Sequence, residues 1–261
     1  MATLPSQNLQ SVRLSSLNSP KFPSRIQIHP SKIPISSPIR IKPSTKLCTG
    51  NNGISNSRLV GRASASGFSA DVADILGDVS IFTAAGEPVL FKDLWDQNQG
   101  IAVVALLRHF GCPCCWELAM ELKQAKARFD SAGVKLIAIG VGAPNKARIL
   151  AERLPFPMDC LYADPDRKAY DVLGLYFGIG RTFFNPASIK VFSSTRFEAL
   201  KKAVENYTIE ATPDERSSVL QQGGMFVFKG NELLYARKDE GTGDHAPLDD
   251  VFDICCKVPA A

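Results

Sequence analysis

Seven apolar residues, Ile101 to Leu107 (IAVVALL), follow one another without a polar residue between them. A strand with one face in water alternates apolar and polar residues, whereas a central strand of an α/β sheet is buried on both faces. The run therefore predicts a central strand with helices on both sides of its sheet. It leads into RHFGCPCCWE (108–117), which places Cys112, Cys114 and Cys115 within four residues.

The segments around this strand alternate between extended and helical patterns. Trp116 to Phe129 has apolar residues at helical spacing, Ser131-Ala132-Gly133 ends that helix, and Val134 to Val141 predicts a second buried strand. Further expected elements are a strand and a helical turn within 78–95, helices over 145–154, 164–173 and 196–207, a strand over 158–162, a long loop over 175–194, a hairpin of strands 225–228 and 233–237, and a last helix from 247. This order indicates an α/β protein, a thioredoxin-like three-layer sandwich with a central mixed β-sheet. A flavodoxin-like sheet is the competing topology.

The first 70 residues differ from the rest of the chain. They hold no Asp or Glu but nine of the 30 Lys and Arg residues, fifteen serines and seven of the 17 prolines. A basic, Ser-rich, acid-free N-terminus is typical of an organellar transit peptide, and the prolines favour the chloroplast, with the stroma as destination. We expect a cleaved transit peptide over 1–62, a linker over 63–77, a thioredoxin-like domain over 78–256 and a tail over 257–261. The alternative is a disordered basic tail that binds nucleic acid or an acidic membrane.

The net charge, the lengths of the apolar runs and the number of cysteines narrow the classes of protein to which the chain after residue 70 can belong. Without the nine N-terminal basic residues, 21 basic residues face 26 acidic ones, so the net charge is near −5 and no nucleic-acid partner is expected. No apolar run approaches the ~18 residues that span a bilayer, so no membrane span is expected. Seven cysteines, an odd number without a secretory signal, argue against a disulfide framework.

The cysteine cluster lies where the central strand ends and a helix begins. Pro113 fits the first helical position, which makes Cys112 the N-cap residue, with its sulfur facing the free N–H groups and the positive end of the helix dipole. Both effects favour the thiolate, and a pKa shift from ~8.5 to ~6.5 raises the thiolate fraction at neutral pH from a few per cent to about three quarters. Arg108 and His109 are expected to act in the same direction where their side chains face the sulfur.

Cys115 lies about one helical turn after Cys112 and shares its face, so this pair is at disulfide range. A bond between Cys114 and Cys115 would strain the intervening peptide, and one between Cys112 and Cys114 would distort the start of the helix. We therefore predict Cys112 as nucleophile and Cys115 as resolving thiol. Cys114 is a supporting residue of unknown use, and His245 carries no evident chemistry.

A family resemblance rests on these residues. C-x-x-C after a buried strand is similar to the thioredoxin superfamily, and RHFGCPCCWELA, GGMFVFKGNELLYAR and GDHAPLDDV resemble the peroxiredoxin-like 2 group of the alkyl hydroperoxide reductase and thiol-specific antioxidant family. The resemblance runs from Asp78 to Ile254 and looks closest to the plastid-targeted, thioredoxin-like branch. It implies the thioredoxin-like fold and thiol redox activity, with no bound cofactor and with reducing equivalents from thioredoxin or glutathione.

Three positions depart from the patterns of these families. Peroxiredoxins carry Thr or Ser three residues before the peroxidatic cysteine, where this chain has His109, and Arg just before the first hairpin strand, where it has Gly223-Gly224. Both family residues are donors aimed at the peroxide oxygen. The cis-proline that thioredoxins carry before the hairpin is also absent.

Three hypotheses follow. The first is a thiol–disulfide oxidoreductase with an antioxidant or redox-regulatory role, in which Cys112 attacks a peroxide or a client protein's disulfide, and a thioredoxin-type reductant resets the Cys112–Cys115 disulfide. The second is a lipid endoperoxide reductase of the same fold, with the aromatic segment 176–184 lining an apolar groove. The third is a non-catalytic metal-binding or interaction module with His109 and the two cysteines as zinc ligands, whereas the first two hypotheses involve no metal.

Overall fold

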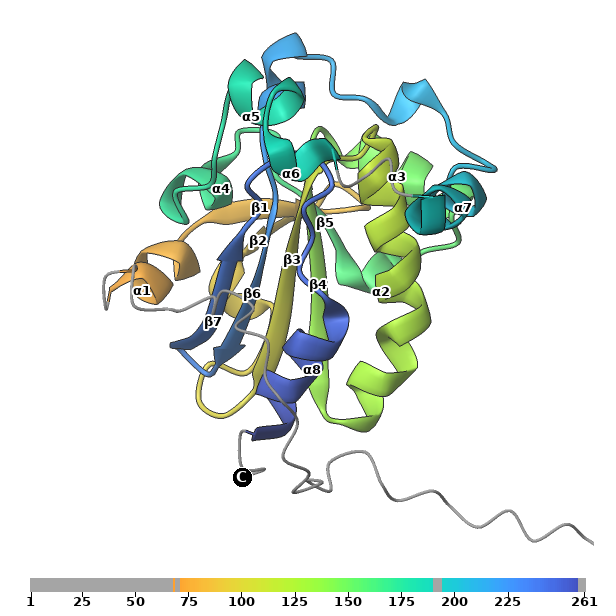
Figure 1. The fold of residues 1–261 in the computed structure, drawn as a ribbon. Coiled ribbons are helices and arrows are strands. Elements are labelled where there is room, and N and C mark those ends of the chain that lie inside the picture. The colour runs from red at the N-terminus through yellow and green to blue at the C-terminus, as the bar shows by residue number, and fades with distance from the viewer. Residues whose placement is uncertain (1–67, 69–70, 190–193, 258–261) are drawn as a thin grey trace, which may run out of the picture. The chain divides into compact units, whose positions relative to one another are not determined.

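The computed structural model describes residue 68, residues 71–189 and residues 194–257 (Figure 1). The predicted transit peptide, residues 63–67 and 69–70 of the predicted linker, residues 190–193 of the predicted loop and nearly all of the predicted tail lie outside the described residues.

A seven-stranded mixed sheet forms the centre of the domain, with the strand order β2-β1-β5-β4-β3-β6-β7. The strands are β1 (Ser80–Thr83), β2 (Pro88–Leu90), β3 (Ile101–His109), β4 (Val134–Val141), β5 (Leu161–Ala163), β6 (Gly224–Lys229) and β7 (Glu232–Lys238). Strands β3, β4 and β5 are parallel, while β6 runs antiparallel to β3 and pairs with β7 in the predicted hairpin. Because Leu106 pairs with Gly224, the end of β3 lies beside the start of β6.

Helices cover both faces of this sheet (Figure 1). Alternate residues of β3 divide between two cores: Val103, Ala105 and Leu107 pack with residues of α2, α3 and α8, whereas Ala102, Val104 and Leu106 pack with residues of α1 and α4. The continuous apolar run of β3 is thus buried on both faces, which confirms the prediction of a three-layer α/β sandwich. The helices are α1 (Val72–Gly77), α2 (Pro113–Ser131), α3 (Pro144–Arg153), α4 (Lys168–Val172), α5 (Ile179–Phe183), α6 (Pro186–Ile189), α7 (Ser194–Ala203) and α8 (Leu248–Lys257), with short 3-10 helices η2 (Phe91–Asp93), η3 (Met158–Cys160), η5 (Ile209–Ala211) and η6 (Arg216–Leu220).

Helix α2 carries the cysteine cluster at its first turn. It starts at Pro113 with Cys112 in extended N-cap geometry, as predicted. Its last turn gives way to Gly133, whose positive φ of 68° fits the predicted glycine stop. Phe129 near that end stacks on Phe252 of α8 with ring centroids 4.3 Å apart, so the far end of the helix is fixed in the core.

Two segments differ from the sequence-based expectation. Six residues of the predicted linker form α1, because Val72, Ala73 and Leu76 are apolar and pack into the second core, so the domain begins before Asp78. The predicted loop over 175–194 contains α5 and α6, which are too short to produce a helical period in the sequence.

Helix α4 is also shorter than predicted. It begins at Lys168 instead of at Pro165. The carboxylate of Asp164 accepts the N–H groups of Lys168 (3.1 Å) and Ala169 (2.9 Å), which fixes the helix start at this later point. Within the described ranges, no helix has the length and apolar character that a bilayer crossing requires.

Candidate functional site

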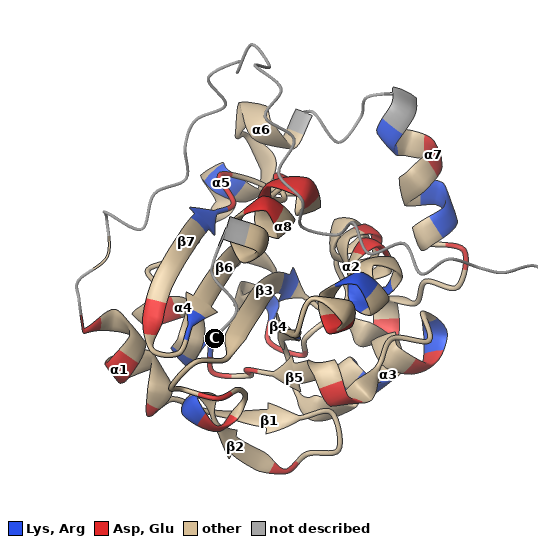
Figure 2. Ribbon diagram, turned by 90° about the horizontal axis from the view of Figure 1, so that it is seen from below, with Lys and Arg blue, Asp and Glu red and all other residues tan. Residues whose placement is uncertain are grey.

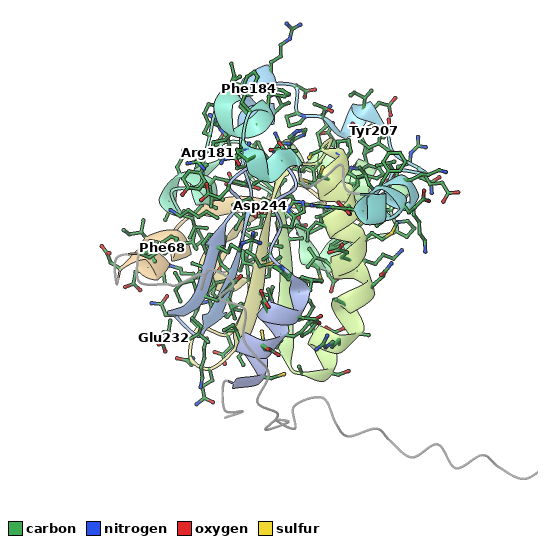
Figure 3. The ribbon with its side chains drawn as sticks, in the orientation of Figure 1. Phe68, Arg181, Phe184, Tyr207, Glu232 and Asp244 are labelled. Atoms are coloured by element: carbon green, nitrogen blue, oxygen red, sulfur yellow. The ribbon has the colours of Figure 1, made fainter. Side chains whose placement is uncertain are left out.

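Two aromatic side chains hold the backbone that leads into the cysteine cluster. The indole Nε1 of Trp116 donates to the carbonyl of Phe110 (2.6 Å), and the Tyr207 hydroxyl donates to the carbonyl of Gly111 (2.8 Å). The two rings meet edge to face with centroids 5.2 Å apart. Figure 3 shows Tyr207 at the end of the sheet where α2 begins. These two hydrogen bonds hold the backbone of the two residues before Cys112 and thereby fix the position of Cys112.

The three clustered cysteines are buried and carry free thiols. The pKa of Cys112 is lowered well below its usual range, chiefly because its sulfur accepts hydrogen bonds from the thiols of Cys114 and Cys115. Burial opposes this shift, and the positive charge of Arg108 adds to it. Cys112 makes no side-chain cap bond to the helix amides. The expected direction of the pKa shift is found, but neighbouring thiols are its main cause, in place of the helix amides.

The pKa values of the two partner thiols, Cys114 and Cys115, are shifted in the opposite direction, upward. The hydrogen bond to Cys112 and then burial raise the pKa of Cys114, whereas burial and then the same kind of bond raise that of Cys115. The sulfur of Cys115 also accepts the backbone N–H of Arg108 at 3.2 Å. This arrangement favours one thiolate, on Cys112, with two thiol protons directed at it.

Arg108 brings a positive charge to this thiolate. Its Nη1 lies 3.4 Å from the Cys112 sulfur, while Nε donates to the carbonyl of Gln221 (3.0 Å) and Nη2 to that of Val219 (2.6 Å). The guanidinium is thus fixed by the segment just before β6. Gly223 in that segment has no room for a side chain, because a Cβ there would lie 2.2 Å from the Leu106 carbonyl oxygen. Arg108, which comes from β3, thus brings a guanidinium to the segment that ends in Gly223-Gly224.

His109 does not add a second positive charge. Burial lowers its pKa to about 4, and the charge of Arg108 acts in the same direction. The imidazole is therefore neutral at pH 7. In its protonated form its charge lowers the pKa of Cys112, in the expected direction, but less than the charge of Arg108 does. Its Nδ1 atom is buried and has no hydrogen-bond partner among the residues that the structure describes.

His245 and Asp239 form a buried pair beneath the first turn of α2. His245 Nδ1 lies 3.1 Å from an Asp239 carboxylate oxygen, and Nε2 lies 3.1 Å from the carbonyl oxygen of Cys114. Both ring nitrogens face acceptors, which only the doubly protonated imidazolium satisfies. Burial lowers the pKa of His245, but the hydrogen bond and charge of Asp239 outweigh it, and the net shift is upward. Sequence reasoning missed this pair, because no local pattern marks it.

A cavity of about 380 Å³ opens beside the cluster. Its wall includes Arg108, His109 and Cys114 on one side and Phe183, Val219 and Thr242 on the others, whereas Cys112 does not belong to it. Phe183 in this wall is 66% exposed, and its neighbour Phe184 is shown in Figure 3 at the outer end of the domain, near Arg181. The cavity thus connects the protein surface with the residues that surround Cys112.

The described part of the chain offers no metal site at these residues. No group of three or more His, Cys, Asp or Glu side chains there is arranged to hold a metal ion, so the zinc hypothesis for His109, Cys112 and Cys115 has no geometric support.

Basic and acidic residues both occur along α2, α3 and α7 (Figure 2), so none of these helices carries charge of a single sign.

A central strand that leads into a helix with one low-pKa cysteine and a second thiol a turn later defines a thiol-dependent oxidoreductase of thioredoxin-like fold. Residues 121–241 match the family described as AhpC/TSA antioxidant enzyme. The chain is 32% identical over 205 residues to "Thioredoxin-like protein AAED1, chloroplastic" of Arabidopsis thaliana, an alignment that covers 77% of this chain and 79% of that protein. The chain therefore belongs to the AhpC/TSA antioxidant enzyme family, which confirms the predicted resemblance.

Two further relatives have different names. "Peroxiredoxin-like 2C" of Bos taurus is 28% identical over 187 residues, covering 70% of this chain and 79% of its own. "Prostamide/prostaglandin F synthase" of Sus scrofa is 28% identical over 193 residues, covering 71% of this chain and 88% of its own. The family match begins at residue 121, after the cysteine cluster, so the roles of the individual cysteines depend on their geometry.

Replacing Arg108 tests its contribution to the thiolate. Arg108→Met removes a cation 3.4 Å from the Cys112 sulfur. A hydrogen bond to a charged group contributes about 1.5–3 kcal/mol, so we expect the pKa of Cys112 to rise by about one to two units. Thiolate absorbance measured against pH gives the pKa. The control is Arg216→Met, which alters an exposed Arg of η6 and should leave the titration unchanged. A pKa equal to that of the wild type in Arg108→Met would contradict the assignment.

The His245–Asp239 pair predicts a pH-dependent stability. In the folded protein the pKa of His245 lies above its usual 6.5, and burial raises that of Asp239 above 3.8. A raised folded-state pKa gives stability at low pH that is lost as the pH rises through it. Both pKa shifts are upward, so both groups lose their stabilising effect as the pH rises. Above pH 6.5, where His245 loses its proton, the free energy of unfolding of the wild type should therefore fall. The uncharged variant His245→Gln/Asp239→Asn should not show this fall. Urea unfolding over a pH series measures this, and parallel curves would refute it.

Proposed function

We propose that the protein reduces peroxides with Cys112 as nucleophile and Cys115 as resolving thiol. The observation that carries this proposal is the Cys112 sulfur, which has a lowered pKa, two thiol hydrogen bonds and a guanidinium 3.4 Å away. A thiolate, not a thiol, is the nucleophile in such chemistry. The arrangement also explains how a sulfur that is only 2% exposed stays ionised.

The reaction has two covalent steps. The Cys112 thiolate attacks one peroxide oxygen, the O–O bond breaks, and the departing oxygen takes a proton to leave as an alcohol or water, which oxidises Cys112 to a sulfenic acid. The Cys115 sulfur then attacks that of Cys112, the S–O bond breaks, and the hydroxyl group leaves as water with the thiol proton. Arg108 is placed to stabilise the anion on Cys112 before the attack.

The site suggests the class of reductant, and the N-terminal sequence suggests the location. Two thiols of a thioredoxin-type protein or of glutathione reduce the Cys112–Cys115 disulfide, and no bound cofactor is needed. A client protein's disulfide is an alternative oxidant for Cys112. We place the protein in the chloroplast stroma. The basic, acid-free N-terminal 70 residues and the similarity to a relative named as chloroplastic support this location.

Intact mass after one equivalent of hydrogen peroxide tests the proposal. The wild type should lose two hydrogens, because the sulfenic acid condenses to a disulfide, and Cys112→Ser should not. Cys160→Ala serves as control, because the groups that act on the Cys160 thiol are Asp159, Lys126 and Lys135, not the three clustered cysteines, and its loss should leave the mass change intact. If wild type and Cys112→Ser keep the same mass, Cys112 is not the oxidised residue.

Reduction of a lipid endoperoxide is a second candidate activity. The largely apolar cavity wall at Phe183 and Val219 and the similarity to a prostamide/prostaglandin F synthase favour it. The same thiolate would attack the ring O–O bond. Turnover of a prostaglandin endoperoxide and of hydrogen peroxide, measured with one reducing system, separates the two. An apolar substrate preference should disappear in Phe183→Asp, which places a charge in the wall at a residue that does not hold Arg108, while turnover of hydrogen peroxide persists.

A further inference from the structure

Cys114 occupies a position that the proposed reaction does not use. It lies between Cys112, whose sulfur it contacts, and the cavity, whose wall it helps to form. Cys112 and Cys115 are 2% and 0% exposed and do not belong to that wall. A disulfide between these two residues therefore lies behind the wall, where an external reductant reaches it slowly, whereas Cys114, which is 6% exposed, lies in the wall itself.

We propose that Cys114 is a second resolving thiol, which carries the oxidation of Cys112 to the cavity, where a low-molecular-weight thiol removes it. This inference rests on the proposed function and names the class of reductant for the same site. The cavity of about 380 Å³ suits a small thiol and not a folded protein. It also has polar groups for such a ligand: the Arg108 guanidinium in its wall, which suits a carboxylate, and His109, which is 6% exposed and has an unpartnered Nδ1.

The transfer to Cys114 is redox-neutral. The Cys114 sulfur loses its proton and attacks the Cys112 sulfur, the Cys112–Cys115 bond breaks, and Cys115 leaves and takes the proton. Cys114 can also attack the Cys112 sulfenic acid directly, with loss of water. Both routes end in a Cys112–Cys114 disulfide. The contact between these sulfurs shows that the start of α2 already brings them together, so the sequence-based argument that helix distortion excludes this bond is weakened.

Leaving-group chemistry favours release through Cys114. An external thiolate that attacks the Cys114 sulfur expels Cys112, the cysteine of the cluster with the lowered pKa, and thiols of low pKa leave fastest. Expelling Cys112 from the other disulfide requires attack on Cys115, which is fully buried. A second external thiol then attacks the external sulfur of the mixed disulfide at Cys114. The sum is one peroxide and two thiols converted to an alcohol, water and one external disulfide.

Serine variants of the full chain test this directly. Cys115→Ser is treated with one equivalent of hydrogen peroxide and its intact mass is measured after acid quench. We expect a loss of two hydrogens, because Cys114 resolves the sulfenic acid, and the double variant Cys114→Ser/Cys115→Ser should instead gain one oxygen that dimedone traps. A Cys115→Ser protein that accumulates the dimedone-reactive species overturns the proposal.

A second experiment measures how fast glutathione reduces the disulfide of the oxidised protein. Oxidised wild type and oxidised Cys114→Ser, in which the hydroxyl keeps a hydrogen-bond donor for Cys112, are mixed with glutathione and the return of free thiols is followed. We expect reduction of Cys114→Ser to be about tenfold slower or more, while Cys160→Ala matches the wild type. Equal rates overturn the role of Cys114 and leave the proposed function intact. A wild type that loses no hydrogens with peroxide overturns the proposed function as well.

Discussion

The contact between the Arg108 guanidinium and the Cys112 sulfur holds the site together. Arg108 is 4% exposed, and a buried cation requires partners for its charge and its N–H groups. The carbonyls of Val219 and Gln221 and the Cys112 sulfur provide them. One side chain thus joins the end of β3, the segment before β6 and the first residue of the cysteine cluster. Ionisation of Cys112 completes this set of contacts, so the thiolate and the cation stabilise each other.

The first turn of α2 lies among further paired charges. Glu117 is almost fully buried and receives the guanidinium of Arg196 at 2.9 Å, and Arg196 also donates to the carbonyl of Gly243. His245 holds the Cys114 carbonyl from the neighbouring segment. These contacts tie the helix start to α7 and to the segment between β7 and α8. They fix the backbone of the cysteines without supplying a net charge that competes with Arg108 for the thiolate.

The parts that sequence reasoning predicted are those with a local signal. Continuous apolar residues predicted β3 and β4, and Pro113 with Gly133 predicted the limits of α2 closely. The environment of Cys112 depends on contacts between residues far apart in the chain. Arg108 reaches partners 111 and 113 residues away, and His245 contacts a carbonyl 131 positions earlier. Burial of His109, which removes its charge, is likewise a tertiary property that local sequence does not encode.

The electrostatics of the three sulfurs sets an order for their reactions. While Cys112 is a thiolate, its charge and its hydrogen bonds keep Cys114 and Cys115 protonated, so neither competes with it for an oxidant. Oxidation of Cys112 removes the hydrogen bonds to its thiolate and the repulsion by its charge, which both contribute to the raised partner pKa values, while the effect of burial remains. The resolving thiols therefore become easier to ionise only after the first step has occurred. In the proposed cycle, the same low pKa that suits Cys112 as the nucleophile also suits it as the leaving group when its disulfide is reduced, so one perturbed sulfur would serve both halves of the cycle.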